Sequence, residues 1–170
     1  MKVEFRKFFA SAVKIAGIGY VVVPGMIVFA ILFLYFDRCG LLFRLEFASA
    51  ATAVRIISAA VAVVSAVMWF IAGFRSRLIE SVMKDQLVTT GIYAWVRNPL
   101  YVAVALMCTS VLVFITCNLA ALLLLALYWL WVTVLVSSTE EKILAAKFGE
   151  VYAQYCSRVN RCIPRFPRRQ

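Results

Sequence analysis

Long apolar segments alternate with short polar ones along this chain. The apolar segments run about Ile15–Phe36, Ile56–Phe74 and Leu100–Ser138. A helix needs roughly 20 apolar residues to cross the hydrocarbon core of a bilayer. Each segment reaches that length, so the pattern predicts an all-α integral membrane protein.

The last apolar segment is too long for one span. Its roughly 39 residues would make a helix near 58 Å long at about 1.5 Å per residue. The only polar interruption is Thr116-Cys117-Asn118. We therefore predict a tight helical hairpin that turns at Asn118, with arms Leu100–Ile115 and Leu119–Val136, which gives about four transmembrane helices in all.

The segments between and after the spans have patterns of their own. Pro24-Gly25 lies inside the first apolar segment and predicts a kink. The mixed stretch 37–47, DRCGLLFRLEF, is typical of a segment at the membrane interface. After Ser138 the chain turns polar, and Glu140–Tyr155 predicts a helical cap with Thr139 as its N-cap. Pro164 and Pro167 should end regular structure.

The net charge of +10 changes the picture less than it would in a soluble protein. The basic residues gather beside the apolar segments, as the positive-inside rule expects, so we predict no nucleic-acid binding. Four spans place both termini on one side, and these residues predict that side to be cytoplasmic: Lys2, Arg6, Lys7, Lys14, Arg75, Arg77, Lys84, Arg97, Lys142, Lys147 and the tail arginines. The other side shows Arg38, Arg44 and Arg55, balanced by Asp37 and Glu46.

The N-terminal basic residues precede an apolar block that is too long for a signal peptide, so we expect a retained first span. The whole chain reads as one membrane domain, with N-terminal spans over 1–86 and a core with its cap over 87–165.

The chain has no histidine, and its five cysteines form no C-x-x-C pair. This composition predicts no metal site and no redox site. Cys39 and Cys117 both fall near predicted outer ends of spans, which makes a disulfide conceivable, but we expect unpaired thiols.

Two polar patches flank the predicted hairpin. Gly91–Tyr101 enters it and Glu140-Glu141 leaves it. Because the arms are antiparallel, both patches should meet at one mouth, with Arg97, two carboxylates and several tyrosines around one pocket. Each feature alone has a simpler interpretation. The aromatic residues Tyr93, Trp95 and Tyr101 would form an interfacial belt, Asn98-Pro99 a helix start, and the glutamates a first-turn charge pair.

Taken together, these groups suit a zwitterionic amino acid that carries a sulfonium, namely S-adenosylmethionine. Arg97 would bind the carboxylate, a glutamate the ammonium or ribose hydroxyls, and tyrosine faces the sulfonium by cation–π attraction. Methyl transfer depends on positioning and exclusion of water more than on acid–base groups, so the missing histidines are no obstacle.

The same residues carry a family resemblance. The stretch LVTTGIYAWVRNPLY, the hairpin and EEKILAAKFGEVYAQYCSRVNRCIPR resemble the isoprenylcysteine carboxyl methyltransferase and phospholipid methyltransferase family. The matching pattern is Gly-x-Tyr-x-x-x-Arg-(His/Asn)-Pro-x-Tyr, Glu-Glu-x-x-Leu and Phe-Gly-x-x-Tyr-x-x-Tyr. The resemblance implies a membrane enzyme that uses S-adenosylmethionine, releases S-adenosylhomocysteine and takes a lipidic acceptor from the bilayer.

By position, the resemblance assigns roles to particular residues. The cofactor-binding set is Tyr93, Arg97, Asn98, Pro99, Tyr101, Glu140, Glu141, Tyr152 and Tyr155. Phe148 and Gly149 would help to build the cap. Glu141 and Arg161 would be catalytic, with Arg161 facing the acceptor.

Two departures from the isoprenylcysteine pattern leave the acceptor open. Asn98 stands where those enzymes usually have histidine, as in phospholipid N-methyltransferases, and VTVLVSST brings no basic residue before the glutamate pair. The Phe-Gly tail still resembles the isoprenylcysteine branch. The acceptor is therefore either the carboxylate of a lipidated cysteine or a phospholipid headgroup, amine or phosphate.

Two other classes of protein stay as alternatives. One is a non-enzymatic membrane scaffold subunit. The other is a sterol-type reductase with a nicotinamide cofactor, whose family shares some C-terminal architecture but usually has more spans.

Overall fold

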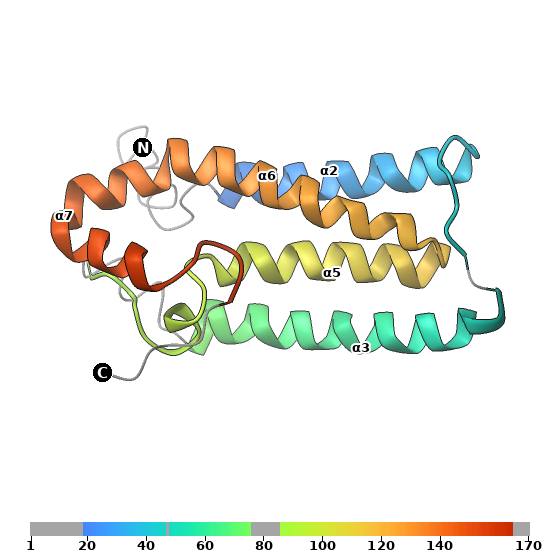
Figure 1. The fold of residues 1–170 in the computed structure, drawn as a ribbon, viewed down its shortest axis with the longest axis horizontal. Helices are drawn as coiled ribbons and strands as arrows, with labels where there is room; N and C mark the ends of the chain where they lie inside the picture. Colours follow the sequence, from blue (N-terminus) through green and yellow to red (C-terminus); the bar gives the residue numbers. More distant parts are fainter. Residues whose placement is uncertain (1–18, 47, 76–85, 165–170) are drawn as a thin grey trace, which may run out of the picture.

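The computed structural model describes residues 19–46, 48–75 and 86–164. Over this part of the chain it is all-helical, and four helices are long and apolar enough to cross a membrane. They are α2 (Gly19–Arg38), α3 (Ala51–Phe70), α5 (Pro99–Thr116) and α6 (Leu123–Ser138), and Figure 1 shows them side by side as one elongated bundle. The predicted all-α membrane fold is confirmed.

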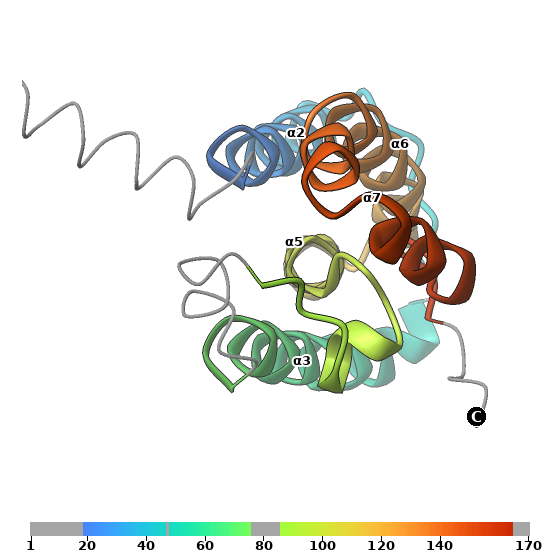
Figure 2. The same cartoon turned by 90° about the vertical axis from the view of Figure 1, so that its left-hand side faces the viewer.

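Helix α5 forms the centre of the bundle. Half of the residues in its apolar stretch are buried, whereas the buried share is 33% in the stretch that contains α6 and 17% in those of α2 and α3. Figure 2 shows α5 between α3 on one side and α2 with α6 on the other. The polar patch Gly91–Tyr101 therefore leads directly into the best-packed helix, which fixes its position.

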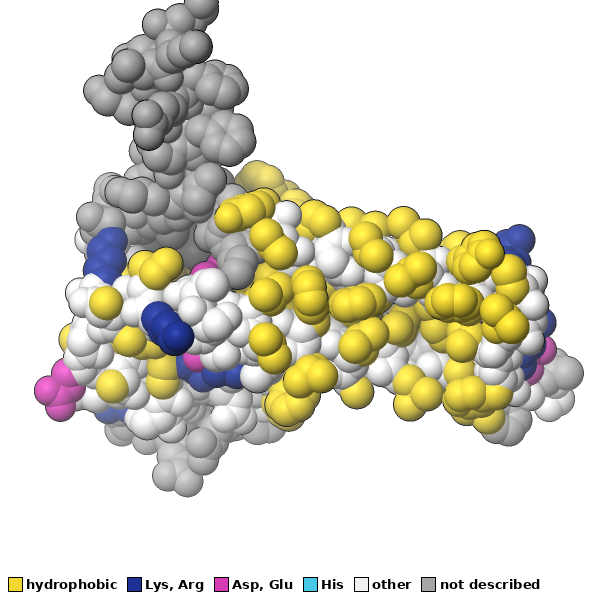
Figure 3. Space-filling view, turned by 90° about the horizontal axis from the view of Figure 1, so that it is seen from above, with side chains coloured by type: hydrophobic (Ala, Val, Ile, Leu, Met, Phe, Trp, Pro, Cys, Tyr) yellow, Lys and Arg dark blue, Asp and Glu magenta, His cyan; other side chains and the backbone are white. Residues whose placement is uncertain are grey.

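The outside of the bundle is apolar along its length. Large side chains such as Ile31, Val64 and Leu123 are exposed on α2, α3 and the start of α6. Figure 3 shows hydrophobic side chains along the shaft and charged ones gathered at its two ends. A largely apolar surface of this kind is costly in water and favourable in hydrocarbon, so, with four helices long enough to span a bilayer, the chain is an integral membrane protein.

Contact between α2 and α6 depends on Gly25. A Cβ atom at this position would lie 2.6 Å from the ring of Trp131. The indole Nε1 of Trp131 donates a hydrogen bond of 3.3 Å to the carbonyl of Val22 on the same turn. Helix α2 continues through Pro24, where the sequence predicted a kink, without a break in the helix. The ring of Trp131 packs directly against Gly25.

The predicted hairpin is confirmed, with its turn at the predicted residues. Helix α5 ends at Thr116, and Cys117 follows in the left-handed conformation at φ 53°. Asn118 then starts the short helix η4 (Leu119–Leu122), which leads into α6. The described cysteines, Cys39 and Cys117 included, are free thiols, as expected.

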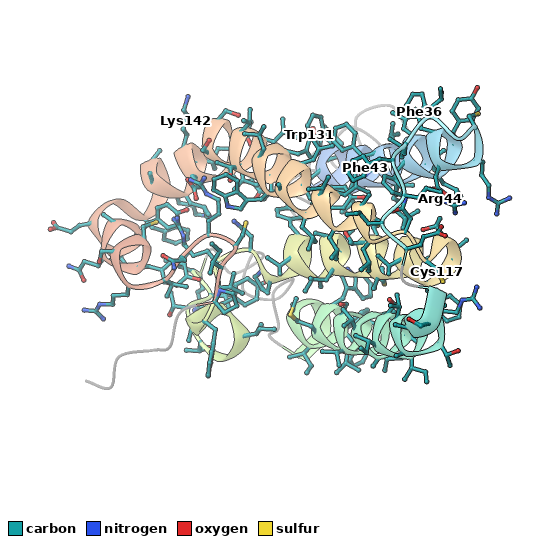
Figure 4. All side chains as sticks on the ribbon, turned by 45° about the vertical axis from the view of Figure 1, so that its right-hand side comes forward. Phe36, Phe43, Arg44, Cys117, Trp131 and Lys142 are labelled. Atoms are coloured by element: carbon teal, nitrogen blue, oxygen red, sulfur yellow. The ribbon has the colours of Figure 1, made fainter. Side chains whose placement is uncertain are left out.

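A group of polar side chains joins the hairpin turn to the stretch that follows α2. We call Asp37, Arg44, Thr116 and Asn118 the loop-end cluster; Figure 4 shows Phe36, Phe43, Arg44 and Cys117 together at that end, far from Lys142. The Asn118 Nδ2 donates to Asp37 Oδ1 at 2.9 Å and to the Phe43 carbonyl at 3.3 Å. Stretch 39–46 is therefore tied over the hairpin turn.

The cap helix α7 (Glu140–Arg158) differs from its prediction in two ways. Thr139 does not cap it, because its hydroxyl donates to the carbonyl of Leu135 at the end of α6. Gly149 breaks it at φ 51°, ψ −123°, a conformation that favours glycine. The result is two arms, and Figure 1 shows the second arm lying back across the end of the bundle.

Two boundaries also differ from the sequence prediction. Helix α3 begins at Ala51 rather than Ile56 and continues into a π-helical turn, η2 (Ile71–Arg75). The start of the first span at Ile15 lies outside the described residues, as do most of the basic residues used to orient the chain: Lys2, Arg6, Lys7, Lys14, Arg77, Lys84 and those after 164.

Candidate functional site

Three charged side chains from distant parts of the chain meet at the end of the bundle under α7. We call Arg97, Glu141 and Arg161 the cap-end cluster. Arg161 binds Glu141 through two contacts, Nε–Oε1 at 2.9 Å and Nη2–Oε2 at 2.6 Å. Arg97 Nη1 lies 3.2 Å from Glu141 Oε1. The two polar patches of the sequence therefore do meet, and Glu141 is the link between them.

Backbone hydrogen bonds hold the two sides of this cluster in register. The N–H of Arg97 donates to the carbonyl of Asn160 at 2.9 Å, and the N–H of Asn98 donates to that of Arg161 at 3.0 Å. Pro99 follows as the first residue of α5, where its missing N–H costs nothing. The segment after α7 is thus clamped to the corner that starts the central helix.

A second contact between the patches lies deeper, at the start of α5. Tyr101 donates its hydroxyl proton to Glu140 Oε1 at 2.8 Å. Glu140 and Glu141 therefore face different partners, although they are neighbours in sequence. Glu140 contacts Tyr101 and Glu141 contacts Arg97, so both carboxylates reach the segment that starts α5. This is the arrangement expected if both patches lie at one mouth.

The tyrosines expected at the site are turned inward. The side chain of Tyr155 donates to the carbonyl of Tyr93 at 2.7 Å, which pins the second arm of α7 to the short helix η3 (Gly91–Ala94). The exposed fractions of Tyr93, Tyr101, Tyr152 and Tyr155 are all below 10%. Burial raises the pKa of Tyr152 and that of Tyr155, so both hydroxyls stay protonated. An interfacial belt fits only the exposed Trp95.

Two hydrogen-bond donors at the cap end, one in the cap-end cluster and one beside it, are not used by the described part of the protein. Within the described residues, the Nε of Arg97 and the Nδ2 of Asn98 are buried and have no hydrogen-bond partner. A buried unpaired donor costs about 1–3 kcal/mol, so such groups in a folded protein call for a ligand or water. These two donors suit a carboxylate or a ribose oxygen.

Two features of the site have no counterpart in the sequence prediction. Arg97 Nη1 donates to the sulfur of Cys156, and Arg161, expected to face an acceptor, has Glu141 as its partner. Hydrogen bonding to Glu141 raises the pKa of Arg161. The pairing of Arg161 with Glu141 is invisible in the sequence because it depends on the turn at Gly149 and on the backbone clamp. The Cys156 contact leaves no motif at all.

Comparison with known proteins gives one match. The family model described as phospholipid methyltransferase matches residues 48–151, more than half of the chain. Neither the curated proteins nor the solved structures yield a match. The matched region runs from the start of α3 through the Arg-Asn-Pro corner, the hairpin and the first arm of α7 into its second. Together with the four spanning helices, this shows that the chain belongs to the phospholipid methyltransferase family of membrane methyltransferases.

Proposed function

We propose that the chain is an S-adenosylmethionine-dependent methyltransferase that acts on a lipidic acceptor embedded in the membrane. The observation that carries the proposal is the union of Arg97, Glu141 and Arg161 at one end of the bundle, with two donors left open beside them. A buried donor without a protein partner calls for a ligand or a water, and these two donors lie beside charged side chains.

The residues present fit the cofactor's groups. The open Nε of Arg97 offers a charged donor to a carboxylate, and the Nδ2 of Asn98 offers a neutral one to a hydroxyl or carbonyl oxygen. Buried tyrosines around them supply ring faces for a sulfonium. In this arrangement Glu141 orients both arginines, and it is a positioning residue rather than a proton acceptor.

The cofactor, when bound, supplies a methyl group on a positively charged sulfur. Held by Arg97 and Asn98, it would supply that methyl to a lone pair of the acceptor, and the electrons of the carbon–sulfur bond would stay on the sulfur. The chain's part is to align the acceptor and to keep water out, which the cap does through the Tyr155–Tyr93 hydrogen bond and the backbone clamp.

For the acceptor, two observations favour a phospholipid headgroup amine. The matched family is described as phospholipid methyltransferase. Glu141 also pairs with both arginines of the cap-end cluster, so an acceptor carboxylate would have to compete with Glu141 for them. The competing acceptor is the carboxylate of a lipidated cysteine, which the tail pattern Phe148-Gly149, Tyr152 and Tyr155 favours.

Lipid mass spectrometry separates these acceptors. The protein is produced in a host membrane, and total lipids and prenylated peptides are compared with those from cells that carry Arg97→Ala. A headgroup that gains one methyl in place of hydrogen supports the phospholipid acceptor, and a methyl ester on a lipidated cysteine supports the other. If no methylated product depends on Arg97, the proposed function is wrong.

A further inference from the structure

One thiol touches the charged side chain on which the proposed site depends. Arg97 Nη1 donates to the sulfur of Cys156 while it also lies 3.2 Å from Glu141 Oε1. We propose that Cys156 is a positioning residue, which holds the Arg97 guanidinium in the orientation that presents its Nε to the cofactor. This inference rests on the proposed function.

The sulfur occupies a defined place between two polar groups. Cys156 stands on the second arm of α7, one helical turn after Tyr152, and burial together with the neighbouring Cys156 thiol raises the pKa of Tyr152. A thiol both donates and accepts, so it can serve the hydroxyl and the guanidinium together. An aliphatic side chain at the same position could do neither.

The nitrogens of the Arg97 guanidinium have different surroundings, which explains why the contact with Cys156 matters. Nη1 is used by the protein, through Cys156 and Glu141, whereas the buried Nε has no partner within the described residues. A free arginine side chain loses rotamer freedom when it is fixed. Fixing Arg97 before the cofactor arrives removes that cost from binding, which is preorganisation.

Glu141 alone would not give the same orientation. Its carboxylate is already held by two contacts from Arg161, and its contact with Arg97 is the longest of the three charged contacts. The thiol therefore supplies the second anchor that a planar guanidinium needs if it is not to rotate about the Nη1–Glu141 contact.

Binding of S-adenosylhomocysteine by purified full-length protein tests the role of the thiol. We expect Cys156→Ala to raise Kd about tenfold, a free-energy change of about 1.4 kcal/mol, and Cys156→Ser to stay within about threefold of wild type because a hydroxyl also donates and accepts. In turnover assays, KM for the cofactor should rise in Cys156→Ala while kcat is kept. Cys39→Ser, at the exposed thiol of the loop end, is the matched control and should change nothing.

A second measurement covers the case in which Cys156→Ala does not fold. N-ethylmaleimide adds the thiol sulfur to its double bond, with the thiol proton going to the neighbouring carbon, and so places a bulky group beside Arg97. Treated wild-type protein should lose binding and treated Cys156→Ser should keep it. The inference is overturned if folded Cys156→Ala binds as wild type does, if serine and alanine lose binding equally, or if the reagent inactivates both proteins alike. Failure of the untreated wild type to bind at all would instead overturn the proposed function, and this inference with it.

Discussion

Polar side chains join distant segments at both ends of the bundle, but the two clusters are built differently. At the loop end, Asn118 is fully buried, and its amide uses all four of its hydrogen-bonding positions, on Asp37, Phe43, Leu45 and Ala120. At the cap end, Glu141 joins two arginines, yet buried donors on Arg97 and Asn98 have no partner in the described chain.

The difference separates a structural cluster from a functional one. A satisfied buried amide stabilises one arrangement of the chain, and removing it leaves several groups unpaired at once. A cluster with spare donors is less stable than it would be if all were paired, and a ligand recovers that loss. The two ends should therefore respond to mutation in opposite ways, the loop end in stability and the cap end in binding.

The largest effect on stability is expected at the loop end. Asn118→Ala removes both donors and the acceptor of the amide, and it leaves the carboxylate of Asp37 without its 2.9 Å partner. The free energy of unfolding should fall by about 3 kcal/mol or more. Equilibrium unfolding in detergent micelles measures this, with exposed Leu122→Ala on the same turn as control. Equal losses for the two variants would show that Asn118 is not the centre of that end.

The largest effect on binding is expected at the cap end. Arg97→Ala removes the open Nε donor and the contact with Glu141, whereas the backbone clamp at residue 97 stays. Affinity for S-adenosylhomocysteine should fall about 100-fold, and Glu141→Gln should act in the same direction. The free energy of unfolding should change by only about 1 kcal/mol, because Glu141 keeps Arg161 as its partner and the unpaired Nε is removed together with the ion pair. A variant that unfolds instead of losing affinity would place Arg97 with the structural residues.

A smaller effect on both properties is expected at the turn of the cap. Gly149 has φ 51° with nothing within 4 Å of an added Cβ, so the cost of Gly149→Ala is backbone strain rather than a clash. We expect about 1–2 kcal/mol, felt mainly by the cap. Limited proteolysis should cut α7 faster in the variant, and cofactor affinity should fall a few-fold. Ala146→Gly, on the first arm, is a control that lacks the positive φ; if it opens the cap equally, the turn at Gly149 is not what holds the cap closed.

The smallest effect is expected from the exposed charge at the loop end. The Arg44 side chain is 50% exposed and lies 3.6 Å from Asp37 and 2.8 Å from Glu46. Exposed ion pairs contribute about 0–1 kcal/mol, so Arg44→Ala should cost less than that. A double-mutant cycle with Asn118→Ala measures any coupling. A loss as large as that of Asn118→Ala would show that charge, not the amide, holds this end.

Local pattern was enough to predict the spans and the hairpin. Segment length fixed four helices, and a single polar interruption placed the turn at Asn118, because hydrocarbon leaves the backbone few other choices. The same reasoning missed what Asn118 does. A partner 81 residues away, Asp37, leaves no periodic signal, and a lone amide in an apolar run shows only that something must satisfy it.

The site was predictable as a meeting of patches but not as a set of contacts. Antiparallel arms were sufficient to bring Arg97 and Glu141 to one mouth. The partner of Arg161 and the role of Cys156 depend on the return of the second arm of α7, which one glycine at φ 51° determines. The expected N-cap failed for a related reason, since the hydroxyl of Thr139 found the nearer carbonyl of Leu135 on α6.

The central claim is that the unpaired donors of the cap end bind the methyl donor. Isothermal titration of the purified full-length protein with S-adenosylhomocysteine tests it most directly. The account predicts saturable binding at one site per chain, strongly weakened in Arg97→Ala and unchanged in Arg44→Ala. Absence of binding up to millimolar ligand, or equal affinity in wild type and a folded Arg97→Ala, would contradict it.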